Sequence, residues 1–124
     1  MLAKLFLIAC FTILPTCTAA QEVWSKGDKV AAFFICKEEK DIMDLALADS
    51  TSREAYASEV MRKRLSRDCI RFIGPPKLFI VDKVITSYKD HNKVEACIMR
   101  ITTPDRILAG YIVAAGTPKN NKGI

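Results

Sequence analysis

The sequence has few of the residues from which metal sites and thiol-based active sites are built. It contains one histidine, His91, and its five cysteines include no close-spaced pair. Structural zinc takes about four ligands, usually with two of them a few residues apart. A catalytic thiol needs a nearby base, and His91, the one candidate, lies in a predicted hairpin turn, where a solvated histidine is the ordinary case. We therefore expect no metal site.

Other signatures of catalysis are missing as well. No Gly-x-Ser-x-Gly elbow and no glycine-rich phosphate loop occurs. Four carboxylates lie along one short predicted helix: Glu38, Glu39, Asp41 and Asp44. This arrangement is typical of a solvent face, not of an isolated acid pair. Because every signature is absent from so short a chain, we expect a protein that is not an enzyme and holds no cofactor.

The amino-terminal residues have the layout of a secretory signal peptide. Lys4 precedes an apolar run over residues 5–14, and small residues follow up to Ala20. This order predicts cleavage after Ala20. A run of ten residues is too short for a hydrocarbon core that needs about twenty. We therefore expect residues 1–20 to be a cleaved signal peptide and the protein to be exported, to a periplasm or outside the cell.

Two alternatives remain for this segment. It could be a lipoprotein signal with Cys10 or Cys17 as the lipidated residue, or an uncleaved anchor. Cleavage after Ala20 would remove Lys4 and leave 18 basic and 14 acidic residues, a net charge of +4. The remaining 104 residues are enough for one domain with one modest core.

Hydrophobic patterning divides the rest of the chain. A polar arm, 21–29, precedes an apolar run at 30–36 that is typical of a buried strand. Helical spacing predicts a helix over 38–48 and another over 52–66. Ala57, Val60, Met61 and Leu65 form an apolar stripe on the second helix, which we expect to face a sheet. Thr51 and Glu54 have the spacing of a capping box at its start.

The second half of the chain is predicted to be β. Three strands, at 78–88, 94–102 and 107–114, are separated by short polar connections and should form an antiparallel meander. We predict a single domain over 30–114 and a flexible tail over 115–124. The fold class is α+β, with two layers: a four-stranded, mainly antiparallel sheet of order β-α-α-β-β-β, and two helices on one face.

Three cysteines remain in the predicted domain, and an oxidising compartment favours their pairing. Cys36 ends the first strand and Cys69 follows the second helix, so a Cys36–Cys69 disulfide would tie the helical excursion to the sheet. The alternatives are a Cys69–Cys97 bridge and a reactive Cys69 thiol whose pKa is lowered by the flanking Arg67 and Arg71. Cys97 is then an inert buried thiol or the link of a disulfide-bonded dimer.

Basic residues gather at the end of the second helix. Arg62, Lys63, Arg67 and Arg71 are candidates for anion binding, because each cation releases counterions when it meets a polyanion. A helix dipole favours the same charges with no ligand. Arg64 stands apart because it falls within the predicted apolar stripe, where it could pair with Asp68 or Asp82.

These observations favour a small exported, non-enzymatic module that binds a protein partner, as an inhibitor, an adaptor or an assembly accessory. The alternative is binding of a polyanion or an anionic membrane surface through residues 62–71, and a lesser one is a reactive-thiol protein using Cys69. Trp24, Tyr56, Tyr88 and Tyr111 could form a contact surface, although core filling explains the last two equally well.

Overall fold

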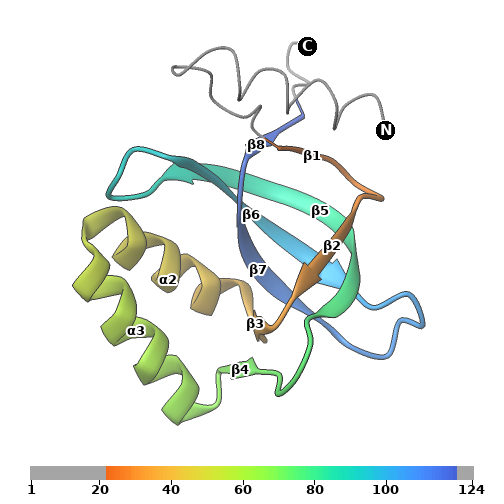
Figure 1. Cartoon of the computed structure of the whole chain (residues 1–124), viewed down its shortest axis with the longest axis horizontal. Coiled ribbons are helices and arrows are strands. Elements are labelled where there is room, and N and C mark those ends of the chain that lie inside the picture. Colours follow the sequence, from red (N-terminus) through yellow and green to blue (C-terminus); the bar gives the residue numbers. More distant parts are fainter. Residues whose placement is uncertain (1–21, 120–124) are drawn as a thin grey trace, which may run out of the picture.

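A computed structural model describes residues 22–119 of the chain (Figure 1). The predicted signal peptide, with Cys10 and Cys17, and residues 120–124 of the predicted tail lie outside the described residues. In chain order the elements are β1 (Val23–Trp24), β2 (Lys29–Ala32), β3 (Phe34–Cys36), α2 (Glu39–Thr51), α3 (Arg53–Ser66), β4 (Cys69–Arg71), β5 (Lys77–Lys89), β6 (Glu95–Thr102), β7 (Ala109–Ala115) and β8 (Thr117–Pro118).

The α+β class is confirmed, but the main sheet has six strands where four were predicted. Its order is β2-β5-β6-β7-β3-β4, every pairing is antiparallel, and the sheet is curled. The apolar run 30–36 is not one strand: it bends at Phe33, so that β2 pairs with β5 while β3 pairs with β4 and β7. The sixth strand, β4, has only three residues, too few for a periodic signal.

Both ends of the described chain are joined in a second, small sheet. β1 and β8 pair in parallel, with Val23 opposite Thr117. The indole Nε1 of Trp24 donates a hydrogen bond to the carbonyl oxygen of Ala115 at 2.9 Å. Residues 115–118, predicted as the start of a flexible tail, are therefore held by backbone pairing that their polar composition does not reveal.

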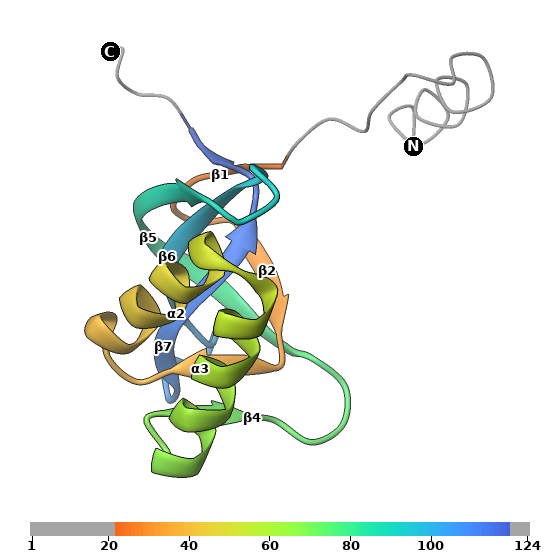
Figure 2. The ribbon, with the colours of Figure 1, turned by 90° about the vertical axis from the view of Figure 1, so that its left-hand side faces the viewer.

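The two helices differ in how they meet the sheet. α2 lies against β6 and β7 and buries Ile42 and Leu45, whereas α3 lies beside α2 and contacts the sheet at β4, its edge strand (Figure 2). The predicted sheet-facing stripe of α3 is wrong, because Met61 is 51% and Leu65 76% exposed. α3 instead turns Tyr56, Val60 and Lys63 inward, a spacing that also follows a helical repeat.

The junction between the helices is capped one residue later than predicted. Thr51 is the last residue of α2, and its hydroxyl donates to the carbonyl oxygen of Leu47 at 3.0 Å. Ser52 caps α3 instead, accepting a hydrogen bond from the Ala55 N–H at 3.0 Å. A serine oxygen satisfies a free N–H of the first turn as well as a threonine would, so the predicted Thr51–Glu54 capping box does not form.

Apolar side chains form two clusters. One lies within the curl of the sheet and includes Phe79, Val81, Met99 and Ile101. The other lies between the sheet and the helices, and includes Ile42, Leu45 and both cysteines of the disulfide. Gly110 lets β7 pass close to β3, since a Cβ there would lie 2.8 Å from the carbonyl oxygen of Cys36.

The predicted Cys36–Cys69 disulfide is confirmed. The two cysteines are register partners on β3 and β4, and the bond closes a sequence separation of 33. Cys69 is 1% exposed and bonded, which contradicts the reactive-thiol hypothesis. Cys97 is a free, fully buried thiol whose pKa is raised to about 11 by burial, with Glu95 adding to the shift. The predicted buried thiol is thus confirmed, whereas a disulfide-bonded dimer, the alternative for Cys97, would require the core to open.

We predict that the Cys36→Ala/Cys69→Ala variant loses about 3–4 kcal/mol of unfolding free energy, because the disulfide limits the entropy of the unfolded chain. Urea unfolding of the variant and the oxidised wild type measures this. Cys97→Ala is the control for loss of a buried sulfur without loss of a cross-link. Separate Cys36 and Cys69 peptides in an unreduced digest would contradict the bridge.

Candidate functional site

A hollow of about 600 Å³ lies where the chain leaves β4. Phe33 contributes from the bend between β2 and β3, Arg64 from the last turn of α3, and Arg71 from the end of β4. We call this hollow the arginine groove. Its lining residues are Phe33, Arg64, Arg71, Phe72, Ile73, Gly74 and Pro76.

Local sequence explains why apolar groups face solvent here. Phe33 is 47% exposed because the strand bends at this residue, and Ile73 is 100% exposed in the connection to β5. Gly74 has a φ of 96°, a conformation that suits glycine, and two prolines follow it. Phe72 anchors the connection: its ring stacks on buried Phe79 at 6.1 Å, and its N–H donates to the Phe33 carbonyl at 2.8 Å.

Cations lie on two aromatic rings of this region, those of exposed Phe33 and half-buried Phe72. The guanidinium carbon of Arg71 is 5.1 Å from the centre of the Phe33 ring, and the Lys77 amine is 5.7 Å from that of Phe72. Such stacking holds a guanidinium in place while its N–H donors remain available at the edge. Within residues 22–119, neither Arg64 nor Arg71 forms an ion pair. The groove therefore combines unpaired guanidinium groups with exposed apolar surface.

The four predicted anion-binding residues do not form one surface. Lys63 is 3% exposed and surrounded by carboxylates, and Arg62 is bound by Glu59. Arg67 is exposed at the end of α3, where its φ of 66° is left-handed, and only Arg71 lines the groove. Arg64 was missed as a site residue, and its interruption of the apolar pattern was the one signal that could have found it. Neither predicted partner, Asp68 or Asp82, pairs with it.

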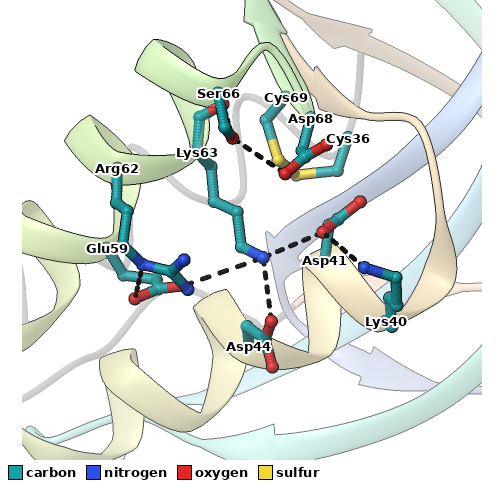
Figure 3. The surroundings of a disulfide bond; sticks show 10 residues. All are labelled: Cys36, Lys40, Asp41, Asp44, Glu59, Arg62, Lys63, Ser66, Asp68 and Cys69. Carbon is teal, nitrogen blue, oxygen red and sulfur yellow. Dashed lines mark hydrogen bonds and ion pairs between the residues drawn. A yellow bond between two sulfur atoms is a disulfide. The ribbon is translucent and has the colours of Figure 1, made fainter.

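Lys63 joins α3 to α2 through a buried ionic cluster, which we call the lysine clamp (Figure 3). Its Nζ lies 2.8 Å from Asp41 Oδ1, 2.8 Å from Asp44 Oδ2 and 3.8 Å from Glu59 Oε2. Asp41 is itself 1% exposed, so the prediction that it belongs to a solvent face is wrong. The amine is fully occupied by carboxylates, which makes the clamp a structural contact.

The pKa directions follow from this geometry. Burial disfavours the charged Lys63 amine, but the hydrogen bonds to Asp41 and Asp44 outweigh burial and raise its pKa. The hydrogen bond from Lys63 also lowers the pKa of Asp44, against the smaller effect of burial. The ion pair thus keeps both groups charged over a wider pH range than in the unfolded chain.

His91 is held against the end of α2 and is not simply a solvated turn residue. Its backbone N–H donates to the carbonyl oxygen of Asp49 at 2.9 Å, and its ring Nδ1 lies 3.0 Å from the same oxygen. The Tyr88 hydroxyl donates to Asp49 Oδ2 at 2.6 Å, and burial together with this bond raises the pKa of Tyr88. These contacts fasten the β5–β6 hairpin to the helical layer.

The described part of the chain contains no group of three or more His, Cys, Asp or Glu residues arranged to hold a metal ion. No helix between residues 22 and 119 is both long and apolar enough to cross a membrane. Comparison with known proteins found no family model, no curated protein and no solved structure that matches the chain. Function is therefore inferred from the contacts, exposure and charges of the residues in the two regions described above.

We predict that Lys63→Met destabilises the protein by about 3–5 kcal/mol, because the variant removes the buried cation of Asp41 and leaves that carboxylate only the exposed Lys40 amine, 3.6 Å away. Urea unfolding at neutral pH is the measurement. The Lys63→Met/Asp41→Leu variant, which removes both buried charges, should recover a large part of the loss. A double variant no more stable than the single one would contradict a cost that arises from the unpaired charge.

The same clamp predicts a pH dependence. The lowered pKa of Asp44 gives stability that is present above its ordinary value of 3.8 and is lost as the pH falls through the lowered value. The raised pKa of Lys63 gives stability that is present below 10.5 and is lost as the pH rises through the raised value. The difference in unfolding free energy between wild type and Lys63→Met should therefore become smaller at acid pH and again at alkaline pH. A difference that is constant from acid to alkali would contradict this.

Proposed function

We propose that this chain is a small exported, non-enzymatic binding module, and that it holds an acidic segment of a protein partner in the arginine groove. One observation carries the proposal: Arg64 and Arg71, without carboxylate partners in the described chain, lie in one hollow with the exposed side chains of Phe33 and Ile73. An inhibitor, an adaptor and an assembly accessory would all use such a surface.

The composition of the groove matches the energetics of protein interfaces. Arginine and aromatic residues dominate the small set of contacts that supply most binding energy, and they do so where surrounding groups exclude water. Carboxylates of a partner would meet the guanidinium donors of Arg64 and Arg71, the latter held on the Phe33 ring, and an apolar side chain would cover Phe33 and Ile73. The positive net charge of the chain would speed the approach of an acidic partner.

Export is supported by two features. The Cys36–Cys69 disulfide is compatible with an oxidising compartment, and residues 1–20 have the layout of a signal peptide. We propose that the partner is met there, in a periplasm or outside the cell.

Binding of a polyanion or an anionic membrane through residues 62–71 remains the second candidate, but fewer residues support it. Lys63 is enclosed by carboxylates and Arg62 is bound by Glu59, which leaves Arg67 and Arg71 of the four. A polyanion gains affinity from each phosphate or sulfate that is neutralised, so losing half of the cations weakens this candidate.

A photo-cross-linking amino acid at position 73 tests the proposal. We expect a protein adduct when the purified mature protein is mixed with extract of its native compartment, and an acidic sequence at the cross-linked peptide. Arg64→Glu/Arg71→Glu should reduce the adduct about ten- to a hundredfold, since hydrogen bonds to charged groups contribute about 1.5–3 kcal/mol.

Arg53→Glu/Lys89→Glu is the matched control, because it makes the same change of four charges at two exposed residues that do not line the groove. An adduct that survives groove reversal, or falls equally in the control, would contradict the proposal. Retention on heparin or anionic vesicles that falls steeply with salt, without any protein adduct, would favour the second candidate.

A further inference from the structure

A second hollow, of about 270 Å³, opens between β2 and β7. Ile42, Leu45 and Tyr56 of the helical layer line one side, and residues 30–34 and 112–114 line the rest. We call it the seam pocket. Phe33 lines both the seam pocket and the arginine groove, so the two hollows meet at this residue.

One wall of the seam pocket is an unpaired edge of β2. The Val81 N–H donates to the Asp28 carbonyl at 2.8 Å, and Val30 lies opposite Phe79 in the same ladder. Hydrogen-bonded pairs alternate along an antiparallel ladder, so the backbone groups of Val30 bond to β5 and those of Ala31 point away from it. Ala31 is exposed, and no strand within residues 22–119 pairs with it on this side.

The opposite wall is an unpaired edge of β7. The Gly116 N–H donates to the Glu95 carbonyl at 2.9 Å, which fixes the alternation and turns the backbone groups of residues 111, 113 and 115 away from β6. Tyr111 pairs with Cys36 of β3, and Ala115 accepts the Trp24 indole. Val113 lies between them, and in the described part of the chain it has no strand partner on that side.

We propose that the partner's segment binds as an extended strand that enters the seam between β2 and β7 and continues past Phe33 into the arginine groove. In the seam its backbone hydrogen-bonds to Ala31 and Val113, and an apolar side chain packs on Ile42 and Leu45. In the groove its carboxylates meet Arg64 and Arg71. This inference rests on the proposed function, and it adds the form and the composition of the ligand: a short acidic peptide with an apolar side chain a few residues away.

Backbone chemistry decides for a peptide over an anionic amphiphile. A fatty acid could place an acyl chain in the seam pocket and its carboxylate near the arginines, but an acyl chain cannot hydrogen-bond to Ala31 and Val113. Strand addition supplies both sets of bonds, and its side chains alternate so that every second one faces the helical layer. The seam is thus matched to a polypeptide.

A phage-displayed library of random dodecapeptides, selected on the oxidised protein, provides the probe. We expect enriched peptides with an acidic cluster beside an apolar residue. Replacing the acidic residues by Asn and Gln should weaken binding at least about tenfold, and so should Arg64→Glu/Arg71→Glu. In a scan of single N-methylated amides in the best peptide, losses should fall at two amides separated by an odd number of residues, because successive amides of an inserted strand point to opposite edges, one facing Ala31 and the other Val113.

Ala31→Leu probes the seam without touching the arginines. The added isobutyl group should fill the pocket and weaken the peptide about tenfold or more, while Ala57→Leu, the same change on the exposed face of α3, should have no effect. Peptide binding should also slow hydrogen exchange at Val113, a readout that needs no variant.

The outcomes separate the two proposals. If acidic peptides depend on Arg64 and Arg71 but not on Ala31, tolerate N-methylation at every amide and leave Val113 exchange unchanged, strand insertion is wrong and the groove proposal stands. If binding ignores groove reversal, both are wrong. Failure to enrich acidic–apolar peptides, or displacement of the selected peptide by oleate at equal concentration, overturns the inference.

Discussion

Residues 29–36 serve two parts of one sheet, and the rest of the architecture depends on that division. Before Phe33 the segment pairs with β5, and after it the segment pairs with β4 and β7. Because this bent segment pairs on both sides of Phe33, it brings the edges of β2 and β7 near each other. The two edges do not pair along their whole length. The bend exposes the Phe33 ring, the incomplete closure leaves the seam pocket, and the continuation into β3 places Cys36 opposite Cys69.

The lysine clamp sets the rotation of α3, and that rotation decides which side chains the protein presents. With Lys63 directed at Asp41 and Asp44, Tyr56 and Val60 turn inward and Met61 and Leu65 turn outward. Arg64, the next residue after Lys63, is then carried to the edge of the arginine groove. Turning the predicted apolar stripe toward the sheet would instead move Lys63 out of reach of Asp41. A buried carboxylate without a cation is costly, so the paired arrangement is the stable one.

Sequence reasoning succeeded where local patterns carry the information. Both helices, the three late strands and the α+β class follow from hydrophobic spacing, and the Cys36–Cys69 pair follows from the ends of a helical excursion. It failed where a pattern has two solutions. The predicted stripe was Ala57, Val60, Met61 and Leu65, and the face that turns inward contains Tyr56, Val60 and Lys63. Both faces fit a helical repeat, and only the position of Asp41 across the interface distinguishes them.

The sequence also could not predict short strands that pair with segments distant in the chain. β4 has three residues, and β1 and β8 have two each, so their formation depends on partners distant in the chain. The arginine groove has the same character: the bend at Phe33, the end of α3 and the connection after β4 contribute one or a few residues each. Arg62, Lys63, Arg67 and Arg71 were grouped by sequence proximity, yet on a helix and the strand after it neighbouring residues face different directions.

Unpaired arginines on a surface are inexpensive, because water screens them and a surface ion pair adds little stability. Their presence alone therefore indicates nothing about function. The exposure of Phe33 and Ile73 beside them is different, since each exposed apolar side chain forgoes stabilisation that burial would provide, about 1.5–3 kcal/mol for a large one. The protein saturates its buried Lys63 with carboxylates, yet it leaves Arg64 and Arg71 open next to uncovered apolar groups. A bound acidic and apolar segment would remove both deficits at once.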